Sequence, residues 1–161
     1  MYIRTAIDEG SKILRKNNIK SYLLDSEILM SKVIKKNRKY VIMNLDKKLN
    51  QQSKDSYISL IKQRSCRKPI AYLIGKKDFW NYEFEISDKV LIPRPDTELI
   101  IEEVLKLTKN KHKLNILDIG VGSGCILLSI LKEKKGFYGT GVDVSQKCID
   151  LSKTNCQRFG L

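Results

Sequence analysis

The sequence predicts an α/β fold in three parts: an N-terminal helical bundle, a β-hairpin linker and the first half of a parallel, doubly wound sheet. Apolar residues recur every three or four positions from residue 2 to about residue 73, which is the period of a helix. The pattern changes at Pro69, and an apolar run at 116–119 later passes into a glycine turn that opens a helix. The expected boundaries are 1–75, 76–93 and 94–161.

Four helical segments are expected in the first part. The first contains the apolar stripe of residues 3–14, and the second follows a Ser21 cap and contains residues 23–34. The third is short and surrounds residues 40–45, and the fourth runs from about residue 51 to 66. Each stripe is interpreted as a face that packs into a core, since a helix needs an apolar face merely to pack.

Charge is distributed unevenly along the chain, whose formal net charge is +13. Residues 1–80 hold 19 Lys and Arg against 7 Asp and Glu, a balance of +12, whereas residues 81–161 hold 12 against 11, a balance of +1. A basic half of this kind can attract nucleic acid or an acidic protein. A general lysine bias, as arises in A+T-rich coding sequence, explains the same composition equally well.

Several classes of protein are disfavoured by the composition. No apolar run reaches the length of a membrane span, and the N-terminus lacks the apolar core of a signal peptide, so a cytoplasmic protein is expected. The four cysteines form no Cys-x-x-Cys pair, and His112 is the only histidine. We therefore expect reduced thiols and no metal site.

A hairpin and a stiff segment are expected to connect the two halves. Residues 79–86 alternate apolar and polar side chains, Ser87-Asp88 supplies a turn, and residues 90–92 form the returning strand. Pro93-Arg94-Pro95 excludes helix immediately before Asp96, which is predicted to cap a helix reaching about Lys109. A strand at 114–119, a helix at 124–134, a strand at 137–143 and a helix at about 145–158 complete the order.

The glycine turn predicts a cofactor site. Glycines let the backbone turn sharply and approach a ligand, but Cys125 stands where a dinucleotide fingerprint needs glycine. Asp118, just before the turn, would repel a pyrophosphate and suits a cofactor with an amino group and a sulfonium charge, S-adenosyl-L-methionine. Asp143 lies about twenty residues further on, where a ribose diol is held. The candidate cofactor-binding residues are Asp118, Gly120, Val121, Gly122, Ser123, Gly124 and Asp143.

Simpler interpretations remain for these residues. Asp118 could only cap the turn, Asp143 could only cap the next helix, and Cys125 is expected to pack and not to act as a nucleophile. The proline-flanked segment reads as a stiff linker on its own physics. Its alternative role is in a substrate or cofactor pocket, for which the candidates are Arg94, Pro95, Thr97 and Glu98.

Four segments together resemble the bacterial glutamine methyltransferases of peptide chain release factors, the HemK type. They are Pro69-Ile70-Ala71-Tyr72-Leu73-Ile74-Gly75, Phe79-Trp80, residues 90–98 and residues 118–126. The resemblance implies a Rossmann-like methyltransferase domain and a bundle that docks the release factor, a protein of translation termination. It implies transfer of a methyl group from S-adenosyl-L-methionine to the glutamine amide of a Gly-Gly-Gln motif. Asp96 stands where the family usually has glutamate.

One family motif, the Asn-Pro-Pro-Tyr clamp for the substrate amide, does not occur in the sequence. The sheet also has only two predicted strands, so the chain is expected to be the front portion of a longer protein. Alone it should bind cofactor weakly or not at all and transfer no methyl group. We expect a monomer whose partners are release factors. No membrane partner is expected, and nucleic acid binding is possible but not favoured.

Other functions stay open at this point. They are an RNA or DNA amino-group methyltransferase, a fusion that also carries a tRNA guanine methyltransferase, and a non-enzymatic docking module if the chain really ends at residue 161. A dehydrogenase is the weakest of them, because of Cys125 and Asp118.

Overall fold

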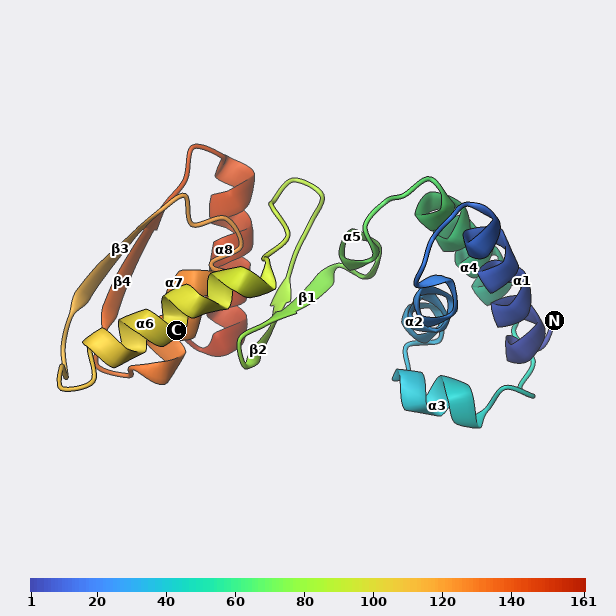
Figure 1. The fold of residues 1–161 in the computed structure, drawn as a ribbon, viewed down its shortest axis with the longest axis horizontal. Coiled ribbons are helices and arrows are strands. Elements are labelled where there is room, and N and C mark those ends of the chain that lie inside the picture. Colours follow the sequence, from blue (N-terminus) through green and yellow to red (C-terminus); the bar gives the residue numbers. More distant parts are fainter. The chain divides into compact units, whose positions relative to one another are not determined.

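The computed structural model describes residues 1–161 and contains both helices and short sheets (Figure 1). The predicted mixture of an N-terminal helical domain and a partial α/β domain is confirmed. Contacts between residues divide the chain into two compact units, Met1–Ile74 and Gly75–Leu161. None of the helices is both long enough and apolar enough to cross a membrane.

The first unit is entirely helical. Its helices are α1 (Ile3–Lys16), α2 (Tyr22–Ile34), α3 (Arg38–Met43), α4 (Gln51–Ser65) and α5 (Ile70–Ile74). The four segments expected from the apolar periodicity are all present, and α5 is an additional short helix directly before Gly75. The apolar faces of these helices meet in one core, which includes Ile7, Leu14, Leu29, Val41, Tyr57 and Ile61.

A polar cluster is enclosed within this core. Ser26 Oγ donates a hydrogen bond to the carbonyl oxygen of Ile7 at 3.1 Å and also contacts the hydroxyl of Tyr57. Burial raises the pKa of Tyr57, so this hydroxyl remains protonated. The helices α1 and α4 approach closely here because Gly10 has no side chain: a Cβ at that position would lie 2.5 Å from the Tyr57 hydroxyl oxygen.

Asp25 forms a second buried polar contact between helices. Arg64 Nε donates to Asp25 Oδ2 at 2.7 Å, and Ser21 Oγ donates to the same oxygen at 2.9 Å. Ser21 does occupy the N-cap position of α2, but its side chain makes no capping hydrogen bond. The expected side-chain cap is therefore wrong, because the buried carboxylate of Asp25 engages the Ser21 hydroxyl instead.

The second unit begins with an antiparallel hairpin of β1 (Lys76–Phe79) and β2 (Tyr82–Glu85). A hairpin was predicted in this region, but its strands were misplaced: the chain reverses at Trp80-Asn81. The turn expected at Ser87-Asp88 is present, closed by the Val90 N–H donating to the Ser87 carbonyl oxygen at 3.2 Å, but it follows the hairpin, and residues 90–92 form no strand. Trp80 adopts a φ of +54°, which is uncommon for a residue with a side chain. Its backbone N–H donates to Glu98 Oε1 at 2.9 Å, and this contact stabilises the unusual turn.

The parallel part of the second unit follows the predicted order. A 3₁₀ turn, η1 (Pro95–Thr97), leads into α6 (Glu98–Leu107), and β3 (Asn115–Ile119), α7 (Cys125–Glu133), β4 (Tyr138–Val142) and α8 (Gln146–Phe159) follow. The strands β3 and β4 are parallel and paired from Asn115↔Tyr138 to Ile119↔Val142. Neither Asp96 nor Thr97 makes the side-chain cap that was predicted for α6, because the 3₁₀ turn occupies the helix start.

The core of the second unit joins the hairpin to the helices. Its buried members are Phe79, Phe84, Ile101, Leu128, Ile130 and Phe137. The rings of Phe84 and Phe159 meet edge to face with centroids 4.9 Å apart, which attaches β2 to α8. Several side chains of β3 and β4 are exposed, with Ile119 at 80% of its full exposure.

Candidate functional site

The centre of the candidate site is the glycine turn that leads from β3 into α7. Gly120, Gly122 and Gly124 have φ values of +89°, +55° and +82°, a region that residues with a Cβ rarely adopt. Gly124 also supplies close packing, because a Cβ there would lie 2.8 Å from Leu128 Cδ1. The spacing of glycines in the sequence therefore corresponds to a turn that only glycine accommodates easily.

The end of β4 fixes this turn. The backbone N–H groups of Gly120 and Val121 donate to the carbonyl oxygen of Val142 at 2.8 and 3.0 Å. Asp143 Oδ2 then accepts the N–H of Gly122 at 3.0 Å, and its Oδ1 accepts the N–H of Ser145 at 2.9 Å. Asp143 thus bridges the glycine turn and the start of α8.

These hydrogen bonds determine the charge state of Asp143. They come first from the Ser145 N–H and then from the Gly122 N–H, and they lower the pKa of the Asp143 carboxyl. The carboxylate is therefore ionised at neutral pH. Each of its oxygens accepts one backbone hydrogen bond and keeps further lone pairs, so the group can still accept hydrogen bonds from ligand hydroxyls.

Asp118 lies one residue before the end of β3 and has the opposite electrostatic setting. It is half-buried, and burial raises the pKa of its carboxyl; the negative charge of Asp143 raises it further. Asp118 pairs in register with Gly141 of β4, so both acids lie at the carboxyl edge of the parallel pair. Ligands of open α/β sheets bind at this edge, and a cationic group there would offset the poorly compensated charge of Asp118.

Asn155 in α8 stabilises the glycine turn through hydrogen bonds, a role that was not predicted from the sequence. Its side chain is fully buried; Nδ2 donates to the carbonyl oxygen of Ser123 at 2.9 Å and to that of Glu85 at 3.0 Å. Its Oδ1 accepts the backbone N–H of Glu85 at 2.8 Å. One amide therefore connects the glycine turn to strand β2. No local pattern signals this role, because the partners are 32 and 70 residues away.

The side chains of Val121 and Ser123, both predicted to be cofactor-binding residues, are buried. Val121 packs toward Gly141, where a Cβ would lie 2.7 Å from Val121 Cγ2. The hydroxyl oxygen of Ser123 is enclosed without a hydrogen-bond partner. These two residues can meet a ligand through their backbone atoms, whereas Asp118 and Asp143 can use their side chains.

Only one end of the segment 90–98, which contains the two prolines around Arg94, lies near the glycine turn. Val90, which begins it, packs near the glycine turn, with Val90 Cγ1 3.7 Å from the position of a Cβ on Gly122. Arg94 and Pro95 are exposed and Thr97 is half-buried. Glu98 accepts the Trp80 N–H, so its carboxylate holds the hairpin turn. Their assignment to a pocket stays a prediction.

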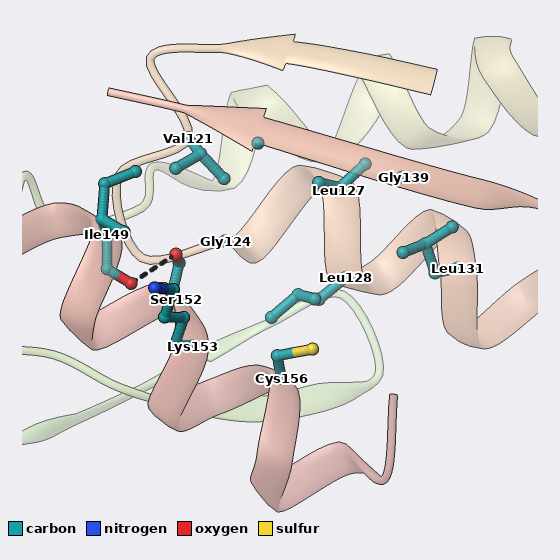
Figure 2. Close-up of a pocket in the computed structure, with 11 residues that line it drawn as sticks. Val121, Gly124, Leu127, Leu128, Leu131, Gly139, Ile149, Ser152, Lys153 and Cys156 are labelled. Carbon is teal, nitrogen blue, oxygen red and sulfur yellow. Dashed lines mark hydrogen bonds between the residues drawn. The ribbon is translucent and has the colours of Figure 1, made fainter. Parts of the chain in front are cut away.

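An apolar cavity of about 160 Å³ lies beside the glycine turn, between α7, β4 and α8 (Figure 2). Leu127, Leu128 and Leu131 point into it from α7, and Ile149 and Cys156 line it from α8. The only hydrogen bond drawn there is internal to α8, from Ser152 Oγ to the carbonyl oxygen of Ile149 at 2.9 Å. Val121 and Gly124 of the glycine turn line this cavity, but neither Asp118 nor Asp143 does, so it is separate from the two carboxylates.

No three His, Cys, Asp or Glu side chains come together in a group that could hold a metal ion. All four cysteines are free, and burial raises the pKa of the Cys125 thiol at the start of α7. The thiol is therefore protonated and is not an activated nucleophile. The donor set of two carboxylates and a glycine turn fits a ligand with a cationic group and hydroxyls.

Sequence comparisons show which known proteins this chain is similar to. Residues 5–75 match the family model described as the PrmC N-terminal domain. A release factor glutamine methyltransferase of Clostridium botulinum is 39% identical over 130 residues, which cover 81% of this chain and 46% of that protein. One of Clostridium acetobutylicum is 35% identical over 161 residues, covering 100% of this chain and 56% of that protein.

A "Bifunctional methyltransferase" of Rickettsia conorii is 31% identical over 181 residues, covering 98% of this chain and 34% of that protein. The chain thus spans about half the length, or less, of the curated relatives that it matches. The resemblance to the release factor glutamine methyltransferase family is confirmed, by the family model in the first unit and by these relatives over most of the chain.

Proposed function

We propose that this chain serves the S-adenosyl-L-methionine-dependent methylation of the side-chain amide of glutamine in the Gly-Gly-Gln motif of peptide chain release factors. The relatives carry the name of this activity, and the motif at the candidate site is consistent with it. The observation that carries the proposal is the pair of carboxylates, Asp118 and Asp143, around a glycine turn at the carboxyl edge of β3 and β4.

The two acids have different proposed roles. The half-buried carboxylate of Asp118 attracts the positively charged amino group of the cofactor, which would compensate for the burial of the carboxylate. Asp143 is kept ionised by two backbone N–H groups and accepts the ribose hydroxyls. The turn between them brings the backbone of Gly120 and Gly122 close to the ligand, because no Cβ stands in the way.

When bound, the cofactor supplies an electrophilic methyl group on a sulfonium. The amide nitrogen of glutamine is a weak nucleophile, so the rate depends on aligning it with that methyl group. In the family this alignment is implied for an Asn-Pro-Pro-Tyr segment, which these 161 residues do not contain. The contribution proposed for this chain is to bind and orient the cofactor and to dock the protein substrate.

A chimera tests the proposal directly. This chain replaces the aligned part of the Clostridium acetobutylicum relative, with which it aligns over all 161 residues. The chimera is incubated with S-adenosyl-L-methionine and a release factor, and the Gly-Gly-Gln peptide is analysed by mass spectrometry. We expect one added methyl group on the glutamine side chain. An inactive chimera beside an active natural relative would contradict the proposal.

Methylation of an amino group on RNA is the second candidate, favoured by the basic first 80 residues. It predicts a different result in the same assay: transfer to RNA, with an affinity that falls steeply as salt is raised. Transfer to the release factor without transfer to RNA would remove this candidate.

A further inference from the structure

The first unit contains a basic hollow that the candidate cofactor site does not use. It has a volume of about 300 Å³ and lies where the end of α2 meets α3 and the segment leading into α4. We call it the lysine hollow. Its lining consists of Lys35, Lys36, Lys47 and Lys48 together with Ile3, Val33, Ile34, Tyr40, Leu49, Asn50 and Ser53. No acidic residue lines it.

The positive charge of the lysine hollow is not neutralised from nearby. None of its four lysines forms an ion pair. Asp46, next to Lys47 in the sequence, pairs with Arg4 at 3.3 Å, and Glu27 of α2 pairs with Arg38 at 2.6 Å. The hollow therefore keeps the electrostatic potential of four lysines in one small volume.

Tyr40 holds two of these lysines in place. The Lys47 ammonium lies 5.0 Å from the centre of the Tyr40 ring and the Lys36 ammonium 5.7 Å from it. Lys47 Nζ also donates to the Tyr40 hydroxyl at 2.8 Å, and this bond, with the two positive charges, lowers the pKa of Tyr40. The cation–π contacts reduce the freedom of the lysine side chains, so less entropy is lost when they bind an anion.

The backbone at the two sides of the hollow adds to its positive character. Lys35 ends α2 in the left-handed conformation with a φ of +53°, and both Lys35 and Lys36 line the hollow. On the other side is the N-terminus of α4, where Asn50 Oδ1 accepts the N–H of Ser53 at 2.8 Å. The N-terminal end of a helix carries a partial positive charge.

We infer that the lysine hollow is a docking site for acidic side chains on the surface of the release factor. This inference rests on the proposed function, which makes a protein the substrate. The lining favours protein carboxylates: four lysines line one hollow together with apolar side chains such as Ile3, Val33 and Leu49. A nucleic acid backbone presents successive phosphates and is bound by a groove or row of cations that follows them.

The lysine hollow lies in the part of the chain that carries most of the positive charge, since the balance is +12 in the first 80 residues and +1 in the remainder. Docking carboxylates in the first unit would accelerate encounter with the substrate and fix its orientation. The first unit would then recognise the body of the release factor, while the second unit binds the cofactor.

The experiment measures binding of this 161-residue chain to a fluorescently labelled release factor at low and at physiological salt. The hollow variant is Lys36→Glu with Lys47→Glu. The matched control is Lys16→Glu with Lys20→Glu, which makes the same change of net charge at exposed lysines outside the hollow. Circular dichroism confirms that both variants remain folded.

We expect the hollow variant to weaken binding about tenfold or more and the control to weaken it about twofold or less. Equal losses in both variants, no loss in the hollow variant, or no binding by the unaltered chain would overturn the inference. So would a single-stranded RNA of mixed sequence that binds through the same lysines while the release factor does not. The chimera separates the two proposals when it carries the hollow substitutions. If it then methylates the release factor with an unchanged KM for that substrate, the lysine hollow is rejected as a docking site while the proposed function stands.

Discussion

The side-chain amide of Asn155 donates a hydrogen bond to the backbone carbonyl of Ser123 at 2.9 Å. This contact attaches the middle of α8 to the glycine turn, and the same amide pairs with both backbone polar groups of Glu85 in β2. The turn is thus held from two directions, by Asp143 at the Gly122 N–H and by Asn155 at the Ser123 carbonyl. The conformation that we assign to cofactor binding depends on these two side chains.

Asn155→Ala should destabilise the second unit. Three backbone groups would lose their partner, the buried Ser123 carbonyl and the partly buried N–H and carbonyl of Glu85, and an unsatisfied buried polar group costs about 1–3 kcal/mol. We expect a loss of about 2–4 kcal/mol, because the three costs are not fully additive. Denaturant unfolding measures the loss, and hydrogen exchange at the Glu85 N–H localises it. Thr154→Ala, on the exposed side of α8, is the control, and equal stability of the two variants would contradict the assigned role.

Gly10→Ala should destabilise the first unit although alanine is the better helix former. Alanine gains about 1 kcal/mol in a helix interior. Its Cβ, however, would lie 2.5 Å from the Tyr57 hydroxyl oxygen and 2.9 Å from both Ile61 Cδ1 and Ser26 Oγ. Overpacking of this kind costs about 1–3 kcal/mol, and loss of the buried hydrogen bonds adds to it, so a net loss of about 1 kcal/mol or more is expected.

Thermal unfolding measures the effect, with Lys12→Ala on the exposed face of α1 as the control for helix propensity. A Gly10→Ala variant as stable as the parent chain would show that α1 and α4 can separate without cost at this point.

Glu133 should make the hairpin turn sensitive to acid. Its Oε1 accepts hydrogen bonds from Trp80 Nε1 at 2.8 Å, Tyr82 Oη at 3.2 Å and Asn81 Nδ2 at 3.3 Å. These bonds, that of Trp80 first, lower the pKa of the Glu133 carboxyl. A carboxyl whose pKa is lowered by folding contributes stability above its unfolded pKa, and that contribution is lost as the pH falls through the folded pKa.

Trp80 is the only tryptophan, so the tryptophan fluorescence reports on the surroundings of this one side chain. We expect an acidic transition in the fluorescence of the unaltered chain below the ordinary pKa of glutamate. The transition should be absent from Glu133→Gln, which cannot lose a charge. The same transition in both chains would assign it to another group.

The sequence was sufficient where structure is decided locally. Glycines at 120, 122 and 124 predicted the turn, and the strands and helices around it lie within a few residues of the expected bounds. The hairpin turn was misplaced because the positive φ of Trp80 depends on Glu98 and Glu133, which are 18 and 53 residues away. Asn155 was missed for the same reason, since a polar residue in a helix has no pattern that reveals a distant buried partner.

Asp118→Asn should stabilise the chain at neutral pH while removing the proposed cofactor contact. Burial and the charge of Asp143 raise the pKa of Asp118, so the folded state favours its protonated form and loses stability as the pH rises through that raised pKa. The variant should therefore melt at a higher temperature than the parent at neutral pH. Asp78→Asn, an exposed acid in β1, is the control.

Below the unfolded pKa of aspartate, both the parent and Asp118→Asn carry a neutral group, and the difference in melting temperature should disappear. A variant less stable than the parent at neutral pH would mean that the ionised form of Asp118 has a partner in the folded chain.

The central claim is that Asp118 and Asp143 form the cofactor half-site, and equilibrium binding of S-adenosyl-L-methionine to the chimera tests it most directly. Isothermal titration would compare the unaltered chimera with Asp118→Asn, Asp143→Asn and the control Asp78→Asn. We predict about tenfold or greater loss of affinity for each of the first two variants and none for the control, since each removes one charged contact to the ligand. Unchanged affinity in both Asp118→Asn and Asp143→Asn would contradict the account.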